Sequence, residues 1–260
     1  MNFQNGELDR VVVLVAHPDD ETIACAGLLQ RATRGLVVFA VDGAPPHYGF
    51  EKKFGSLLNY SSIRLEEASR ALKFIPGVSV RRLTRPTGTA FVDQHLVLDL
   101  PEASASLRHV ISDFNPSLFV SHALEGGHVD HDACHILAKQ ASAEFGLRHL
   151  EFPLYWRTGD GTDVFQQFRP NGNREFILQL TSQELNRKRR MFVEYRTQQN
   201  LTSVFTLENE RFRYVTKAEH SKPNWSAYPF ENRRLGLKTA VFLQNVVEFE
   251  RCTAKAASHG

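Results

Sequence analysis

The stretch that decides the fold is Val11–Ala16, VVVLVA, which runs directly into His17-Pro18-Asp19-Asp20-Glu21. A short, continuous run of apolar and mostly β-branched residues is typical of a strand buried on both faces of a parallel sheet. Thr22–Arg34 then predicts a helix that ends at Gly35, and Leu36–Val41 predicts a second buried strand. Strand, helix and strand in this order predict a right-handed βαβ unit.

The rest of the chain extends this unit into an α/β pattern. We expect a loop at Asp42–Leu58, helices at Ser62–Phe74, Leu100–Phe114, His131–Phe145 and Thr181–Thr197, and strands at Val78–Leu83, Leu118–Ser121, Phe152–Tyr155 and Glu175–Leu180. Helix Thr181–Thr197 carries Lys188, Arg189 and Arg190, which predict a solvated face. No repeat or linker divides the chain, so we expect a single domain over residues 1–260 with an irregular C-terminal part.

Composition excludes several classes of protein. The chain has 260 residues, is 42% hydrophobic and 23% charged, and has a formal net charge of +2, which gives no electrostatic case for a nucleic-acid or membrane-surface partner. Its 3 cysteines are widely spaced and form no disulfide framework. Met1–Arg10 lacks the pattern of a signal peptide, and no apolar run reaches the ~20 residues that span a bilayer. We therefore expect a cytoplasmic protein without stable membrane insertion.

The first chemically informative segment is His17 to Glu21, at the carboxyl end of the first predicted strand. Ligands bind at this edge in open α/β sheets. Two adjacent carboxylates and an imidazole are costly to bury unless a cation compensates them, and a metal ion would do so. In a structural alternative, Asp19 or Asp20 caps the following helix and Glu21 lies in its first turn.

The second segment is His128-Val129-Asp130-His131, which follows the predicted strand Leu118–Ser121. It lies at another carboxyl edge and can therefore converge on the first segment. His128 and His131 are three residues apart, whereas His131 and His135 are four apart, so both pairs can share a helix face. Spacing alone does not choose between these pairs.

One imidazole and one carboxylate from the first segment, with one imidazole from the second, suit zinc or another divalent transition metal. Such a site leaves a position for water, whose pKa falls towards about 7. The second carboxylate can take the proton of that water, and a further histidine can stabilise an oxyanion or protonate a leaving group. The dinucleotide-binding, P-loop and serine-hydrolase motifs are absent from the sequence. The residues therefore favour metal-assisted hydrolysis.

Together, Ala16 to Glu21 and His128-x-Asp130-His131 resemble the LmbE-like, or PIG-L, family of zinc-dependent N-deacetylases. Four further stretches are similar to motifs of that family: Arg64-Leu65-Glu66-Glu67-Ala68, Glu125-Gly126-Gly127, Lys188 through Tyr195-Arg196-Thr197-Gln198, and Glu210-Arg211-Phe212. The resemblance implies a Rossmann-like, mostly parallel sheet sandwiched between helices.

The resemblance also assigns roles to residues at the matching positions. It implies that His17, Asp20 and His131 hold Zn2+, with Fe2+ or another divalent transition metal as an alternative, and it leaves His135 outside the metal ligands. It makes Asp19 the general base. It makes His128 the group that stabilises the tetrahedral intermediate or acts as an acid, with Asp130 orienting it. Arg64 is implied as a substrate-binding or supporting residue, with an ion pair to Glu67 as the structural alternative.

The activity implied by the resemblance is removal of the N-acetyl group from an N-acetylglucosamine-type amino sugar or its conjugate. The partner is then a small N-acetylated amino sugar rather than a nucleic acid, and a homo-oligomer remains one alternative because family members are often oligomeric. A second hypothesis is an amidase that cleaves a larger acyl group from an amino-sugar thiol conjugate. A third is a sugar-binding module without catalytic activity.

Overall fold

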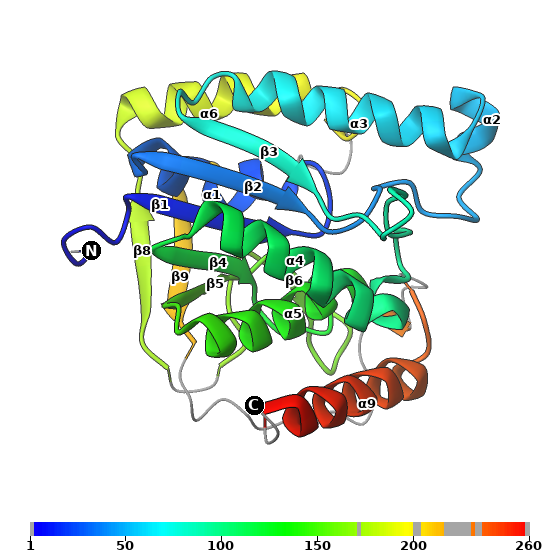
Figure 1. The fold of residues 1–260 in the computed structure, drawn as a ribbon. Helices are drawn as coiled ribbons and strands as arrows, with labels where there is room; N and C mark the ends of the chain where they lie inside the picture. Colours follow the sequence, from blue (N-terminus) through cyan, green and yellow to red (C-terminus); the bar gives the residue numbers. More distant parts are fainter. Residues whose placement is uncertain (1–2, 171–172, 200–203, 216–229, 232–235, 258–260) are drawn as a thin grey trace.

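The computed structural model describes residues 3–170, 173–199, 204–215, 230–231 and 236–257. Within these residues the centre is a seven-stranded sheet in the order β3-β2-β1-β4-β5-β9-β8 (Figure 1). Its strands are β1 (Arg10–Val15), β2 (Arg34–Phe39), β3 (Val78–Arg82), β4 (Leu118–His122), β5 (His149–Phe152), β8 (Glu175–Gln179) and β9 (Asn209–Tyr214). Strands β3, β2, β1, β4 and β5 are parallel, while β9 and β8 are antiparallel. The expected mostly parallel sheet is confirmed.

Helices cover both faces of the sheet. They are α1 (Asp20–Arg31), α2 (Phe50–Phe54), α3 (Leu57–Leu72), α4 (Leu100–Phe114), α5 (Val129–Phe145), α6 (Ser182–Glu194) and α9 (Thr239–Ala257), with a short 3-10 helix, η1, at Leu96–Asp99. Alternate residues of β1 point to opposite faces of the sheet. Val12 and Leu14 pack with α4, α5 and α9 on one face, whereas Val11 and Val13 pack with α1, α3 and α6 on the other. Figure 1 shows these two groups of helices on opposite sides of the sheet. The predicted arrangement, a sheet sandwiched between helices, is therefore confirmed.

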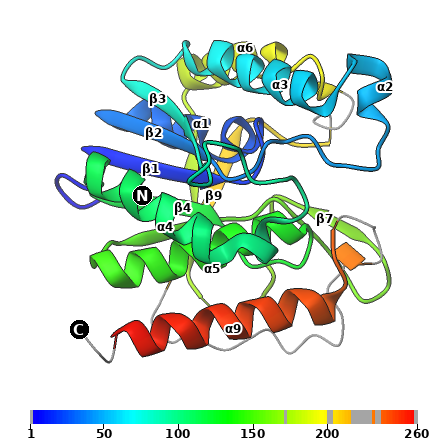
Figure 2. The same ribbon diagram turned by 45° about the vertical axis from the view of Figure 1, so that its right-hand side comes forward.

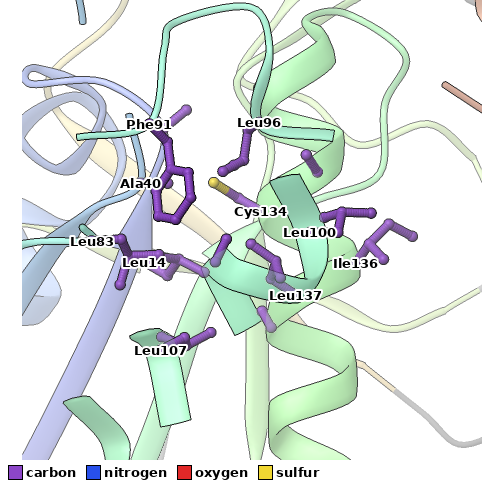
Figure 3. Packing of buried hydrophobic residues seen from close by; sticks show 14 of the residues in the cluster. Leu14, Ala40, Leu83, Phe91, Leu96, Leu100, Leu107, Cys134, Ile136 and Leu137 are labelled. Atoms are coloured by element: carbon purple, nitrogen blue, oxygen red, sulfur yellow. The ribbon is translucent and has the colours of Figure 1, made fainter. Parts of the chain in front are cut away.

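The connection between β3 and α4 is anchored in the core. Phe91 and Leu96 from this connection are fully buried and join Cys134 and Leu137 of α5 in one hydrophobic cluster (Figure 3). In the sequence, Phe91 precedes Asp93 and Leu96 follows it. Their packing therefore fixes the connection against α5 and holds Asp93 near the carboxyl ends of the strands.

Three helices begin earlier in the chain than expected: α1 begins at Asp20 instead of Thr22, and side-chain caps explain the early starts of α3 and α5. The side chain of Ser56 accepts a hydrogen bond of 3.0 Å from the backbone N–H of Asn59, so α3 begins at Leu57. His128 caps α5 in the same way, which moves its start to Val129. The expected loop Asp42–Leu58 also contains the short helix α2.

The described residues of the C-terminal part include one strand and one long helix. Strand β9 pairs with both β5 and β8 in the central sheet, and α9 packs against α4 and η1 (Figure 2). Phe242, Val246 and Phe249 form the buried stripe of α9 at helical spacing. The strand expected at Phe152–Tyr155 is instead the junction of β5 with β6 (Tyr155–Arg157), which pairs with β7 (Asp163–Phe165).

Within the described residues, no helix combines the length and the apolar character needed to cross a bilayer.

Candidate metal centre

The two motif segments meet at one edge of the sheet. Strands β1 and β4 are parallel neighbours, with Leu14 opposite Ser121 in the register. The His17 segment follows β1, His122 ends β4, and His128 caps the N-terminus of α5. The carboxyl ends of adjacent parallel strands thus bring these side chains together, as the sequence predicted.

Asp19 has the N-cap position of α1, but its carboxylate does not cap the helix. The backbone carbonyl of Asp19 accepts hydrogen bonds of 3.0 Å from the N–H groups of Thr22 and Ile23, whereas its side chain makes no cap hydrogen bond. Its backbone φ of 138° lies where residues other than glycine are rarely found. The capping alternative therefore does not account for this carboxylate.

Arg64 of α3 holds the loop that carries Asp19. Its guanidinium donates to the carbonyl oxygens of Gly43 at 2.6 Å and Pro18 at 2.8 Å, and its Nη2 lies 3.3 Å from Asp19 Oδ2. Gly43 permits this contact, because a Cβ there would lie 2.9 Å from Pro18 Cδ and 3.1 Å from Arg64 Nη1. Arg64 thus orients both the backbone and the carboxylate of this segment.

Glu67 does not form the ion pair with Arg64 that the structural alternative proposed. Its carboxylate accepts hydrogen bonds from the backbone N–H of Thr197 at 3.0 Å and from the hydroxyl of Thr197 at 2.6 Å. The guanidinium of Arg64 is instead paired with Asp19. The Arg-x-x-Glu stretch therefore connects the site loop, through α3, to the segment after α6.

Asp20 lies at the centre of a group of imidazoles. Its Oδ2 is 3.4 Å from His17 Nδ1, 3.6 Å from His131 Nε2 and 3.3 Å from His122 Nε2. Three overlapping sets of buried side chains have ligand atoms within 4.8 Å of one another: His17, His128 and His131; His17, Asp93, His128 and Asp130; and Asp20, His122 and His131. The three expected ligands are thus brought together, although no single set contains all of them.

Asp93 and His122 belong to this centre and were not assigned to it from the sequence. Asp93 Oδ1 lies 3.4 Å from His17 Nε2, on the ring edge opposite Asp20. His122 Nε2 also accepts a hydrogen bond of 3.1 Å from the N–H of Ala16. Asp93 lies in an aperiodic connection, and His122 ends an apolar strand. A polar residue at a strand end was the only signal available.

The chemistry of the centre fits a divalent cation. Among the described residues, His122 Nδ1 and His131 Nδ1 are buried without a hydrogen-bond partner, and Asp93 Oδ1 has the 3.4 Å contact with His17 Nε2 in place of a well-formed hydrogen bond. Burial alone would lower the pKa of His17, but Asp93 and hydrogen bonds with Asp130, Asp20 and Asp93 raise it well above its usual value. The surroundings therefore favour positive charge between these carboxylates, and mixed nitrogen and oxygen donors suit zinc or a similar metal.

His128 is oriented by the backbone of Asp130 rather than by its carboxylate. His128 Nδ1 accepts a hydrogen bond of 3.2 Å from the N–H of Asp130, which leaves Nε2 to carry the proton of the neutral ring. The pKa of His128 is lowered from an ordinary 6.5 to about 3, mainly by burial and then by the neighbouring His17. The Asp130 carboxylate accepts from the N–H groups of Gln94 and Leu96 at 2.5 and 3.1 Å. It therefore fixes the connection that carries Asp93.

Asp19 has the electrostatic character of a base near neutral pH. Its pKa is raised from an ordinary 3.8 to about 8: burial is the main cause, Arg64 acts in the opposite direction, and Asp20 adds to the increase. A cation at the centre would favour the ionised carboxylate. Asp19 is thus a carboxylate whose protonation responds to the charge beside it, as a general base requires.

His135 contacts groups other than Asp20. Its Nδ1 lies 3.1 Å from the carbonyl oxygen of His122 and 3.2 Å from Glu151 Oε2. None of the three candidate metal-binding sets found in the described residues includes it. This placement supports leaving His135 outside the metal ligands.

The Glu125-Gly126-Gly127 loop joins the centre to strand β6. The carboxylate of Glu125 accepts from the N–H groups of Leu154 and Tyr155 at 2.9 and 3.2 Å. Gly127 lies so close to β6 that a Cβ there would be 1.9 Å from the carbonyl oxygen of Tyr155. As a result the ring of Tyr155 lies 5.2 Å from that of His131. A side chain at position 127 would displace β6 from the centre.

The stretch that begins at Lys188 supports α1, the helix that follows the His17–Asp19 loop. Lys188 is fully buried and donates to the carbonyl oxygen of Ile23 at 2.8 Å. Arg189 and Arg190 are exposed. The prediction of a solvated face was therefore correct for these two residues and wrong for Lys188.

Residues 12–142 match the PIG-L family, described as GlcNAc-PI de-N-acetylase. The fold is similar to the deacetylase of the teicoplanin biosynthesis pathway, with a TM-score of 0.62 and 20% identity over 82% of this chain and 100% of that chain. It is also similar to N,N'-diacetylchitobiose deacetylase from Pyrococcus horikoshii, with a TM-score of 0.53 and 16% identity over 87% and 91% of the two chains.

A third similar structure has a different activity. It is the 4-carboxy-2-hydroxymuconate hydratase from Pseudomonas putida, with a TM-score of 0.51 and 16% identity over 84% of this chain and 100% of that chain. At these identities the three structures establish the fold alone. No curated protein matches the chain.

Proposed function

The chain belongs to the PIG-L family, and we propose that it is a metal-dependent hydrolase that removes the N-acetyl group from an N-acetylglucosamine-type amino sugar or its conjugate. The observation that carries this proposal is the buried cluster of imidazoles and carboxylates, with the Asp19 carboxylate held beside Asp20 by Arg64. Deacetylation is also the reaction named for two of the proteins with a similar fold.

We assign the metal to His17, Asp20 and His131. The contacts of Asp20 Oδ2 with both imidazoles, at 3.4 and 3.6 Å, support this choice. Zn2+ suits two nitrogen donors and one oxygen donor, and Fe2+ is the alternative. Such an ion polarises an amide carbonyl and lowers the pKa of a water molecule.

The remaining side chains then divide the proton transfers. Asp19 accepts a proton from the attacking water as its oxygen bonds to the carbonyl carbon. The neutral ring of His128 has its proton on Nε2 and can donate a hydrogen bond to the oxygen that becomes negative. The carbon–nitrogen bond breaks, the amine leaves with a proton returned from Asp19, and acetate is released.

Two other functions are separated by the substrates that are hydrolysed. An amidase for larger acyl groups would use the same side chains and differ in acyl length. A binding module would hold the sugar without hydrolysis, but an intact carboxylate at Asp19 speaks against it. Because a hydratase also has a similar fold, amide hydrolysis must be measured directly.

The test uses the purified full chain with its metal content measured in parallel. We expect release of acetate and of free amine from N-acetylglucosamine, N,N'-diacetylchitobiose or an N-acetylglucosamine conjugate, and slower cleavage when acetyl is replaced by a longer acyl group. An Asp19→Asn variant with equal metal content is the matched control. Metal-loaded protein that hydrolyses none of these amides would contradict the proposal, and a preference for long acyl groups would favour the amidase.

A further inference from the structure

Glu21 and Tyr195 form a buried contact close to the centre but outside the metal-ligating sets. Glu21 lies in the first turn of α1, Tyr195 directly follows α6, and their exposures are 0% and 1%. The Tyr195 hydroxyl donates a hydrogen bond to Glu21 Oε1, which also accepts from the hydroxyl of Thr22 at 2.7 Å. One oxygen of the carboxylate is therefore fixed by two hydroxyl donors.

The other oxygen of Glu21 binds the backbone of the proposed base. Glu21 Oε2 accepts a hydrogen bond of 3.1 Å from the N–H of Asp19. Asp19 has φ 138° and ψ −31°, a conformation that L-residues adopt only when the surrounding structure holds them there. Backbone strain of this kind clusters at functional sites, where it sets the direction of a side chain.

Asp19 is thus held from two sides. Arg64 binds the carbonyl of Pro18 and the Asp19 carboxylate on one side. Glu21 holds the Asp19 amide on the other. We infer that Glu21 and Tyr195 are positioning residues, which keep Asp19 in its strained conformation and so aim its carboxylate at the water beside the metal ligands. The inference rests on the proposed function for the role of Asp19 as base.

Tyr195→Phe tests this role because it removes the hydroxyl and keeps the packing of the ring. We expect kcat to fall by about ten-fold or more, since loss of one hydrogen bond to a charged group is of this order. We expect KM and metal content to stay within about two-fold of wild type, because Tyr195 belongs to none of the metal-ligating sets found in the described residues. Loss of kcat alone distinguishes positioning from a general loss of stability.

Glu21→Gln provides a second variant if Tyr195→Phe does not fold. The amide has one oxygen and cannot accept from both Asp19 and the two hydroxyls, so kcat should fall in the same way. The kcat of the double variant should be no more than about two-fold below that of the less active single variant, because both changes break the same connection.

Tyr214→Phe is the matched control. The Tyr214 hydroxyl also donates to a buried carboxylate, that of Glu7, but Glu7 precedes β1 and lies at the opposite end of the sheet from the centre. This variant should keep the kcat of wild type. If it loses as much kcat as Tyr195→Phe, the effect is general and the inference is wrong.

A crystal structure of Tyr195→Phe gives a readout that does not need activity. We expect the Asp19 backbone to leave its positive-φ conformation or its carboxylate to rotate away from Asp20. Unchanged kcat in metal-loaded Tyr195→Phe, or an unchanged Asp19 in its crystal structure, would overturn the inference. If wild type hydrolyses no amide, the proposed function fails, and the crystal structure still decides whether Tyr195 holds Asp19.

Discussion

The ammonium group of Lys188 lies 2.9 Å from the carboxylate of Glu210, and neither side chain has any exposed surface. Glu210 also accepts hydrogen bonds from the N–H groups of Gly27 and Leu28 in α1, at 2.7 and 3.0 Å. Gly27 permits this approach, because a Cβ there would lie 3.0 Å from Glu210 Oε2. The pair thus connects α6 and β9 to α1, the helix that follows the His17–Asp19 loop.

Lys188→Met should therefore destabilise the fold. It leaves the Glu210 carboxylate buried without its cation, which typically costs about 3–5 kcal/mol. Urea unfolding of the two proteins at pH 7 measures the difference in free energy of unfolding. The double variant Lys188→Met with Glu210→Gln is the control and should recover part of the loss. A loss below about 1 kcal/mol in Lys188→Met would show that the pair is not required for stability.

Asp19→Ala should separate metal binding from turnover. The carboxylate of Asp19 is paired with Arg64 and is not among the three candidate metal-binding sets of the described residues. We expect metal content like that of wild type and a fall in kcat of about 10²–10⁴-fold, the usual contribution of a general base. Metal analysis and an acetate-release assay on the same sample check both parts. Near-normal turnover in a metal-loaded sample would exclude Asp19 as the base.

The choice between two helical histidines can be tested by metal content. His131 Nε2 lies 3.6 Å from Asp20 Oδ2, whereas His135 Nδ1 lies beside the carbonyl of His122 and the carboxylate of Glu151. We therefore expect His131→Ala to lose most of its bound metal and His135→Ala to keep it. Both substitutions remove one imidazole from α5, so each is the control for the other. The reverse result would move the metal one turn along α5.

Local sequence was sufficient to predict the parallel sheet and the two motif segments that meet at the candidate metal centre. The apolar run Val11–Ala16 has one structural solution in an α/β chain, a buried strand, and the polar residues after it must then lie at the ligand-binding edge. The same logic placed His128 and His131. These predictions needed only residues that are adjacent in the chain.

Long-range contacts account for what the sequence did not show. Asp93 reaches His17 because Phe91 and Leu96 are buried against α5, and no periodic pattern marks that connection. Lys188 resembled a solvated residue because its partner, Glu210, lies on another element. Neither contact leaves a local signal, since each depends on packing between segments far apart in the chain.

The stability of the fold should depend on pH through His149. This imidazole is buried next to Ser121, whose hydroxyl lies 2.7 Å from Nε2. Its pKa is lowered from an ordinary 6.5 to about 3, mainly by burial and in addition by the neighbouring His135. Between these two values the unfolded chain binds a proton that the folded protein excludes. The free energy of unfolding should therefore fall as pH decreases below 6.5, with a contribution approaching about 1.4 kcal/mol per pH unit.

His149→Gln tests this contribution because glutamine can bond to Ser121 but does not titrate in this range. Urea unfolding at pH 7.5, 6.5, 5.5 and 4.5, with a chelator present so that metal release does not contribute, gives the slope for each protein. The slope of wild type should exceed that of the variant between pH 6.5 and 4.5, because the other titrating groups are common to both. Equal slopes would mean that His149 takes up a proton in the folded state, and its burial would then not be a source of acid sensitivity.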